Sequence, residues 1–394
     1  MTATVAFAAQ APFIGGAERA LLRLVGALDD TRYRPFVIID RRGEVTDALR
    51  SANIPHRQVA LPPPERRWPW PFARSVMRIA AEMLRHRAVL LHTSDPPAHL
   101  APSLAARLLR LPRICHVHFT YPADGLRWSL KWGFERALFA SEYAKRDAQR
   151  QCPELFPEHR CAVIAYGFDP PPPPDAPRLA ALRAECGLDA DDVVIGFVGR
   201  VIESKGVADY LHMASALAAQ HPRWRFLIVG DDQRPRPSYR VEMETLAAQL
   251  GIAPACRFIG FRNDVWDLLH LCDVVVMPSH VEPFGIVALE AGAAGRPVVA
   301  AHVGGIPEVV HDRATGVLVP PRDPRALANA VAQLIADPQR RAELGCRGRV
   351  HVAARFGLGA HARAVMDLYD DVRRSAEPQA GGMGSPKAKF FTSA

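Results

Sequence analysis

Residues 278–301 read PSHVEPFGIVALEAGAAGRPVVAA, and this stretch decides the fold that the sequence predicts. It follows an apolar run at 274–277, whose valines and closing proline are typical of a buried parallel strand. A helical run at 286–294 and a second short strand at 297–300 complete a β-α-β unit. The loop at 282–285 is therefore predicted to lie at the carboxyl end of a strand, the edge where open α/β sheets bind ligands.

The residue types in this loop suit an anionic ligand that carries a sugar. A helix that begins near Gly285 points free backbone N–H groups into the cleft and favours a phosphate. Because Gly285 has no side chain, a ligand can approach its backbone closely. Glu290, about one turn into the helix, can accept hydrogen bonds from a vicinal diol such as a ribose, while Glu282 faces whatever lies beyond the phosphates. Spacing alone leaves the alternative equally open, namely that both carboxylates are solvated.

The run Glu282-Pro-Phe-Gly-Ile-Val-Ala-Leu-Glu290 resembles the E-x7-E signature of the retaining family-4 glycosyltransferases. This resemblance implies an α/β chain of the GT-B fold, in which two Rossmann-like domains with parallel sheets face each other across a deep cleft. It implies transfer of a sugar from a nucleoside-diphosphate-sugar donor to an acceptor with retention of the anomeric configuration, in cell-surface glycan or glycolipid synthesis. Glu282 would hold the sugar and Glu290 the ribose, with Phe284, Ile286 and Val287 beside the donor.

A second loop carries the cations that a diphosphate needs. Arg200 and Lys205 follow the strand predicted at 193–198, so both lie at the ligand edge of the sheet. The chain contains 44 Arg and five Lys, and Lys205 is the only lysine between residues 170 and 374. A lysine in such a chain indicates a need for a compact point charge. The resemblance implies that Arg200 and Lys205 neutralise the pyrophosphate of the donor as the glycosidic bond breaks.

The first half of the chain supplies further candidates. His118 stands at the carboxyl end of the strand predicted at 113–117, where an imidazole is either a satisfied core residue or a ligand. The stretch Val117-His118-Phe119-Thr120 resembles the V-H-x-T of the family, whose histidine contacts the transferred sugar. Gly15 and Gly16, at a predicted strand-to-helix turn, permit close approach of a phosphate or sugar, although an ordinary turn would also explain them.

The resemblance is incomplete after the second strand of the donor domain. The family commonly has Gly-x-Gly there, whereas Gly230 is followed by Asp231 and Asp232. We still expect Gly230 to bind the donor, and we expect the base or sugar end of the pocket to differ from that of the family. The only Asp-x-Asp, at 189–191, precedes a strand and is not a plausible metal site. We therefore expect no catalytic metal and no other cofactor, since the nucleotide-sugar is a co-substrate.

The length of 394 residues suffices for two domains of ordinary size. Five consecutive prolines at 170–174 predict a stiff linker, because a proline run lacks amide donors. We expect an acceptor-side domain at 1–169 and a nucleotide-sugar-binding domain at 170–358. The resemblance implies that a helix at about 359–372 returns to the first domain, and the polar tail at 375–394 is predicted to be disordered.

The remaining elements follow from hydrophobic patterning. In the first domain we expect strands at 4–9, 36–39, 55–60, 89–92, 113–117 and 162–165. We expect helices that include residues 21–28 and 72–84, and helices at 96–109 and 126–138. Ser141 is expected to cap the helix that follows it. In the second domain we expect strands at 193–198, 226–229, 257–259, 274–277 and 317–319, and helices at 206–219, 238–250, 263–271, 286–294, 324–336 and 339–354.

The composition of the chain also indicates its cellular compartment. No apolar run approaches the eighteen or so residues that a membrane span needs, and the N-terminus lacks the basic region of a signal peptide. Seven cysteines without a C-x-x-C pair indicate reduced thiols. These observations favour a cytoplasmic protein.

The positive charge is concentrated in one segment. The chain carries a formal net charge of +8, and residues 57–150 hold 16 basic against 7 acidic side chains. Trp68, Trp70, Trp128 and Trp132 fall in the same segment, and basic residues interleaved with tryptophan are typical of a membrane-interface surface. We expect peripheral attachment to the cytoplasmic leaflet and an acceptor on a lipid carrier or glycolipid, and no nucleic-acid partner. The alternative, tryptophans in the core and arginines on a solvated face, stays open.

Two rival functions share the expected architecture. One is a catalytically silent GT-B protein that serves as a binding or scaffold subunit, and the presence of Arg200, Lys205, Glu282 and Glu290 weighs against it. The other is a nucleotide-sugar epimerase, of which the E-x7-E segment is not the hallmark. A glycosyltransferase is the function that the sequence favours.

Overall fold

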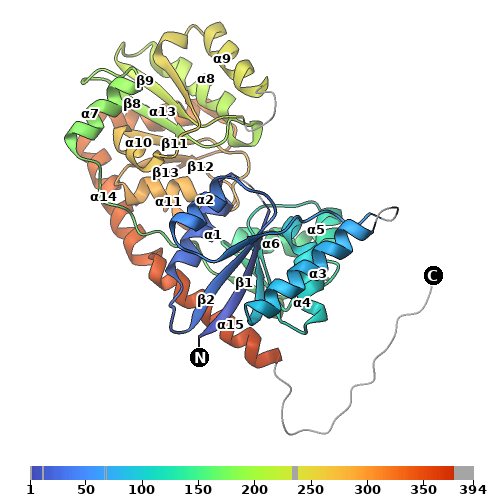
Figure 1. The fold of residues 1–394 in the computed structure, drawn as a ribbon. Coiled ribbons are helices and arrows are strands. Elements are labelled where there is room, and N and C mark those ends of the chain that lie inside the picture. Colours follow the sequence, from blue (N-terminus) through green and yellow to red (C-terminus); the bar gives the residue numbers. More distant parts are fainter. Residues whose placement is uncertain (1, 11–12, 66, 68, 233–237, 377–394) are drawn as a thin grey trace.

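A computed structural model describes residues 2–10, 13–65, 67, 69–232 and 238–376. The described chain forms two α/β lobes, each built on a parallel sheet (Figure 1). Every strand pairing within the two sheets is parallel, so the carboxyl ends of neighbouring strands lie at one edge of each sheet.

The first sheet has the strand order β3-β2-β1-β4-β5-β6-β7. Its strands are β1 (Ala3–Ala9), β2 (Tyr33–Ile39), β3 (His56–Gln58), β4 (Ala88–Thr93), β5 (Arg113–Val117), β6 (Arg136–Phe139) and β7 (Cys161–Val163). The helices of this domain are α1 (Gly16–Ala27), α2 (Glu44–Ser51), α3 (Trp70–Arg85), α4 (Leu100–Leu108), α5 (Ala123–Ser129) and α6 (Glu142–Gln151).

The second sheet has the strand order β10-β9-β8-β11-β12-β13. Its strands are β8 (Val193–Val198), β9 (Trp224–Val229), β10 (Cys256–Gly260), β11 (Val274–Met277), β12 (Val298–Ala301) and β13 (Gly316–Val319). The helices that follow the first domain are α7 (Ala176–Glu185), α8 (Val207–Ala218), α9 (Ser238–Gln249), α10 (Val265–Leu271), α11 (Ile286–Ala293), α12 (Ile306–Val309), α13 (Pro324–Ala336), α14 (Pro338–Arg355) and α15 (Leu358–Ala376).

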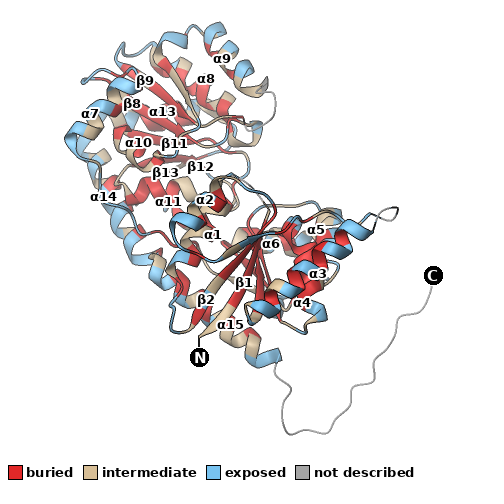
Figure 2. Cartoon of the chain, in the orientation of Figure 1, coloured by how far each residue is buried: buried red, intermediate tan, exposed pale blue. Residues whose placement is uncertain are grey.

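The sheets are buried on both faces, as parallel sheets require (Figure 2). Strand β8 shows the reason, because its VVIGFV sequence sends alternate side chains to two different cores. Val194 and Val198 pack in one cluster, and Ile195 and Phe197 pack in the other. This continuous apolar run predicts a buried strand at 193–198, and the structure has strand β8 at these residues.

The C-terminal helix α15 joins the two domains. Its buried residues Val365, Met366 and Tyr369 lie in the same hydrophobic cluster as Phe7 of β1 and Leu24 of α1. Helix α14 packs instead on α11 of the second domain, so the chain crosses between domains near residue 357 (Figure 1). Helix α15 extends to Ala376, which makes the first two residues of the expected tail helical. Residues 377–394, the rest of that expected tail, lie outside the described residues.

The prediction of a single helix at 126–138 is wrong. Helix α5 ends at Ser129, and residues 136–139 form strand β6, which pairs with both β5 and β7. The RALF sequence of β6 is short and apolar, and such a run cannot be assigned to strand or helix from periodicity alone. Pairing with β5 and β7 satisfies its backbone groups and buries Leu138 and Phe139. Three helices, α2, α7 and the four-residue α12, were absent from the sequence prediction.

Candidate active site

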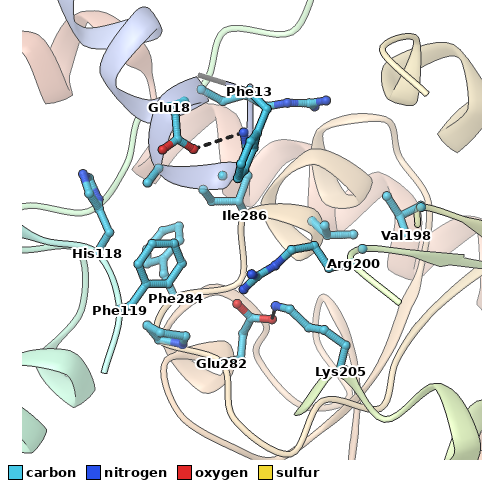
Figure 3. A pocket seen from close by; sticks show the side chains of 18 of the residues that line it. Phe13, Glu18, His118, Phe119, Val198, Arg200, Lys205, Glu282, Phe284 and Ile286 are labelled. Carbon is cyan, nitrogen blue, oxygen red and sulfur yellow. Dashed lines mark hydrogen bonds and ion pairs between the residues drawn. The ribbon is translucent and has the colours of Figure 1, made fainter. Parts of the chain in front are cut away.

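A cavity of about 450 Å³ lies between the two domains. Its wall combines residues at the carboxyl edges of both sheets, which face each other across it (Figure 3). The wall includes all twelve residues named from the sequence: Gly15, Gly16, His118, Arg200, Lys205, Gly230, Glu282, Phe284, Gly285, Ile286, Val287 and Glu290. The structure thus brings residues from positions 15 to 290 to one place, as the strand-edge argument requires.

The loop at 282–285 leads directly into α11. Gly285 is the residue before the helix, and its φ of 104° is in the left-handed region, which a residue with a side chain rarely adopts. Phe284 is buried and its ring meets that of Tyr166 edge to face, with centroids 4.9 Å apart. Since Tyr166 follows the last strand of the first sheet, this contact fixes the loop against the opposite domain.

The two cations share the cavity with Glu282. Arg200 follows β8 and is exposed, whereas Lys205 ends a short 3-10 turn at 203–205. The Nζ of Lys205 lies 2.6 Å from Oε2 of the buried Glu282. Figure 3 shows Arg200, Lys205 and Glu282 converging on one part of the pocket. A diphosphate entering there would meet two positive charges and only one negative charge among these three side chains.

The position of these cations depends on close backbone packing. A Cβ on Gly206 would lie 2.0 Å from the carbonyl oxygen of Pro278, so the turn of Lys205 packs directly on the end of β11. A Cβ on Gly230 would lie 1.8 Å from the carbonyl oxygen of Gly199. Gly230 lines the cavity, but these contacts show that its main structural effect is to support the loop of Arg200.

Glu290 is buried and makes an interdomain ion pair. Its Oε1 accepts a hydrogen bond from Nη2 of Arg23 at 2.5 Å, and Nη1 of Arg19 is 3.9 Å away. Both arginines lie on α1, one helical turn apart, so they present their side chains on one face. A ribose at Glu290 would therefore share this carboxylate with a cation from the first domain, which the sequence analysis did not foresee.

His118 is buried and neutral. Its Nδ1 shares a hydrogen bond with the hydroxyl of Tyr166, and burial lowers the pKa of His118 to about 3. Burial also raises the pKa of Tyr166 well above its usual value, so that hydroxyl keeps its proton. In the tautomer in which Tyr166 is the donor, the ring proton of the neutral imidazole is on Nε2, which is buried without a hydrogen-bond partner among the described residues. A ligand hydroxyl in the cavity is a chemically suitable acceptor for it.

The Gly15–Gly16 turn has local roles in addition to its place in the cavity wall. The N–H of Gly15 donates to Oε2 of Glu18 at 3.1 Å, which closes the start of α1 (Figure 3). A Cβ on Gly16 would lie 3.3 Å from Cδ1 of Ile286, so Gly16 allows α1 to approach the start of α11. Burial raises the pKa of Glu18 above its usual range, with the positive charge of Arg200 among the opposing influences.

Sequence reasoning missed the carboxylates of Glu18 and Asp95 in the cavity wall. Asp95 follows β4, and burial raises the pKa of its carboxyl to about 7. Tyr121 donates to its Oδ2, while Oδ1 has no hydrogen-bond partner among the described residues. The signal that could have found it is its place just after a predicted strand, the same rule that found Arg200 and Glu282.

Two family models match the chain. The model described as Glycosyltransferase Family 4 matches residues 14–171, and the one described as Glycosyl transferases group 1 matches residues 180–351. Together they cover both domains of the structure.

Curated relatives and solved structures agree with these matches. A D-inositol 3-phosphate glycosyltransferase of Corynebacterium kroppenstedtii is 37% identical over 196 residues, which are 49% of this chain and 43% of the relative. The chain spans about half the length of the curated relatives it matches. Alr3699/HepE of Anabaena, solved with UDP and glucose, is 24% identical with a TM-score of 0.82 over 93% of this chain and 99% of that one. Sucrose-phosphate synthase of Thermosynechococcus elongatus is 23% identical, with a TM-score of 0.75 over 95% and 100%.

Two Rossmann-like domains whose parallel sheets face one cavity define the GT-B class of protein, as the resemblance implied. Within that class, the chain belongs to the family-4 glycosyltransferases.

Proposed function

We propose that this protein transfers a sugar from a nucleoside-diphosphate-sugar to an acceptor hydroxyl, with retention of the anomeric configuration. The observation that carries the proposal is the meeting of Arg200, Lys205, Glu282 and Glu290 with the start of α11 in one interdomain cavity. Two cations and a helix N-terminus suit a diphosphate, and a carboxylate one turn into that helix suits a ribose. The UDP and glucose named with the Anabaena structure are ligands of this chemical kind.

The mechanism that we propose is electrostatic. Arg200, Lys205 and the backbone N–H groups at the start of α11 stabilise charge that develops on the departing diphosphate. Lys205 exchanges its contact with Glu282 for the diphosphate, which frees Glu282 to accept hydrogen bonds from sugar hydroxyls. His118 donates from Nε2 to the sugar. The diphosphate takes the proton of the acceptor, and because the protein cations neutralise its charge, no metal ion is required.

We further propose that the protein attaches to an anionic membrane surface and uses an acceptor on a lipid carrier or glycolipid. Helix α3 supports this proposal, because Trp70, Met77 and Leu84 are 74%, 65% and 63% exposed. The three side chains are spaced by seven residues and so share one face of the helix. Arg74 and Arg78 are exposed on the same helix, whose outer side is uncovered in Figure 2.

The other aromatic residues of the basic segment divide between surface and core. Trp128 is half exposed, and Nζ of Lys131 lies 3.6 Å from its ring centroid. Trp132 packs against the hydrophobic cluster that contains Phe72, so these two side chains are part of the core. Trp68 lies outside the described residues. Among those residues no helix combines the length and apolarity needed to span a bilayer, so the proposed attachment is peripheral, on the cytoplasmic face.

The names of the curated relatives suggest a second acceptor. D-inositol 3-phosphate is a soluble polyol phosphate, and it would enter the same cavity from the first-domain side. Incubation with a panel of nucleotide-sugars, with D-inositol 3-phosphate or glycolipid vesicles as acceptor, tests the proposal by release of free nucleoside diphosphate. We expect release with at least one donor. Binding without release would favour a scaffold protein, and conversion of the donor sugar without net release would favour an epimerase.

A further inference from the structure

Asp95 occupies the first-domain wall of the cavity, opposite the cations that are proposed to hold the donor. It follows the carboxyl end of β4, the strand beside β5 that leads to His118. The exposed ring of Phe119 lines the same side of the cavity (Figure 3). The proposed donor contacts come chiefly from the second domain, so a polar group on this wall is free to bind the other substrate.

The carboxyl group of Asp95 is only half satisfied. Its Oδ2 accepts a hydrogen bond from the hydroxyl of Tyr121, and the backbone N–H of His118 also lowers the pKa of the carboxyl by hydrogen bonding. Oδ1 is buried and has no hydrogen bond of normal geometry with the described residues. A buried oxygen without a hydrogen bond destabilises the folded protein, because it loses its contacts with water and gains none in return. An unsatisfied oxygen of this kind, in a residue of the cavity wall, is explained if a ligand supplies the missing hydrogen bond.

We propose that Oδ1 of Asp95 accepts the hydrogen bond of the attacking acceptor hydroxyl and orients it toward the anomeric carbon. The inference rests on the proposed transferase function and assigns a residue for the acceptor half of it. In the transfer step the bond from the anomeric carbon to the diphosphate oxygen breaks, and the bond from that carbon to the acceptor oxygen forms. The electron pair of the broken bond leaves with the diphosphate. The acceptor proton, held first by Oδ1 of Asp95, turns to the diphosphate oxygen as negative charge develops there, and it ends on the diphosphate. Asp95 therefore acts by holding the hydroxyl and is unchanged by the reaction.

The protonation state of Asp95 is expected to make the rate of sugar transfer depend on pH. Burial raises the pKa of Asp95 to about 7, and only the ionised carboxylate accepts hydrogen bonds with both oxygens. Transfer is thus expected to rise with pH through about 7. The titratable side chains that influence Asp95 or respond to it are Tyr121, Glu18, Cys115 and Tyr166. Burial raises the pKa values of Tyr121, Cys115 and Tyr166 further above 7, so these three are not expected to titrate with Asp95. Burial also raises the pKa of Glu18, and the Tyr121→Phe variant separates the two carboxyls because Tyr121 donates to Asp95.

Asp95→Asn tests the inference, because it keeps the size of the side chain and removes its charge. The probe is D-inositol 3-phosphate, or a glycolipid in vesicles if only that supports turnover by the unmodified protein. We expect kcat/KM for the acceptor to fall at least about tenfold while the Kd for free UDP changes less than about twofold. The matched control is Asp124→Asn, a fully exposed aspartate on α5, which is expected to change neither quantity.

Tyr121→Phe provides a second readout that does not depend on the first variant. The tyrosine hydroxyl lowers the pKa of Asp95 by donating to it, so its removal is expected to move the pH limb of transfer upward. Unchanged acceptor kinetics in Asp95→Asn, or an equal loss of UDP affinity, would overturn the inference, as would an unshifted limb in Tyr121→Phe. If the unmodified protein releases no nucleotide with any donor, the proposed function fails and this inference falls with it. If the unmodified protein transfers sugar and Asp95→Asn matches it, only the inference fails.

Discussion

Arg23 of the first domain donates a hydrogen bond from Nη2 to Oε1 of Glu290 in the second domain, at 2.5 Å. The two residues are 267 positions apart, and their contact joins the two domains at Glu290, a residue of the cavity wall. The Arg23 guanidinium also lies 4.4 Å from the centroid of the Phe168 ring, just before the linker. A nucleotide whose ribose binds Glu290 must accommodate this contact, so donor binding and the contact between the domains are coupled at one carboxylate.

Glu290→Ala and Glu282→Ala are expected to fail in different ways. Loss of Glu290 removes the proposed ribose contact and leaves Arg23 unpaired, so the Kd for free UDP is expected to rise at least about tenfold, the worth of about 1.4 kcal/mol. Loss of Glu282 leaves Lys205 available to the diphosphate, so UDP affinity is expected to hold while sugar transfer falls. Calorimetry with UDP measures the first effect and initial rates measure the second. Equal losses of affinity in both variants would mean that this division of roles is wrong.

Glu308 is expected to hold the domains together. Its two carboxylate oxygens accept hydrogen bonds from the backbone N–H groups of Glu142 and Tyr143, each at 2.9 Å, at the start of α6. Ser141 caps the same helix, as predicted, and its hydroxyl also donates to the carbonyl of Pro283.

Glu308→Ala removes both charged hydrogen bonds, whose worth is about 1.5–3 kcal/mol each, and is expected to lower Tm by at least about 3 °C. Differential scanning fluorimetry measures this. Glu343→Ala, which removes a half-exposed carboxylate from α14, is the control and is expected to leave Tm within about 1 °C. A Tm for Glu308→Ala equal to that of the control would show that the contact contributes nothing.

Acid is expected to destabilise the first domain through its buried histidines. Burial lowers the pKa values of His92 and His118 to about 3 and of His99 to about 4. Below pH 6.5 the unfolded chain binds protons at these residues and the folded chain does not, so stability is complete above pH 6.5 and falls as the pH drops toward 4. Asp95 and Glu18 oppose this, because their raised pKa values favour the folded state as the pH falls, but the three histidines outnumber these two carboxyls.

We expect Tm to fall by more than about 5 °C between pH 6.5 and pH 4.5. His92→Gln is expected to reduce this slope, whereas His221→Gln, which alters an exposed residue, is expected to keep it. A Tm that is flat across this range would contradict the assignment of neutral buried imidazoles.

The exposed face of α3 is expected to bind anionic vesicles. Replacing both Arg74 and Arg78 with Glu removes two attractions of about 1 kcal/mol each and adds repulsion, so the partition coefficient is expected to fall at least about tenfold. Sedimentation with anionic and with neutral vesicles at low salt measures it. The control reverses the exposed Arg347 and Arg349 of α14 and is expected to sediment like the unmodified protein. If the unmodified protein stays in the supernatant with anionic vesicles, a soluble acceptor becomes the better proposal.

The sequence predicted much of the site because functional residues of a parallel sheet follow the carboxyl ends of its strands. Arg200, Glu282 and His118 each follow a buried strand at the predicted residues, and parallel pairing alone brings such positions to one edge. Local pattern could not predict the partner of Glu290, because Arg23 reaches it only through the packing of one domain on the other. The same limit applies to strand β6, whose four residues, three of them apolar, become a strand only through pairing with β5 and β7.

Glu282 holds the ammonium group of Lys205 in the cavity. The proposed role of this lysine is to neutralise the charge of the departing diphosphate. Lys205→Ala removes a charge-assisted phosphate contact worth about 1.5–3 kcal/mol. Lys145→Ala, which removes a lysine paired with Glu142 and Glu158 outside the cavity wall, is the matched control.

The decisive measurement is kcat/KM for the nucleotide-sugar that supports release of nucleoside diphosphate, compared between these two variants and the unmodified protein. We predict a loss of at least about tenfold in Lys205→Ala with an unchanged Tm, and no loss in Lys145→Ala. A value of kcat/KM in Lys205→Ala equal to that of the unmodified protein would contradict the account.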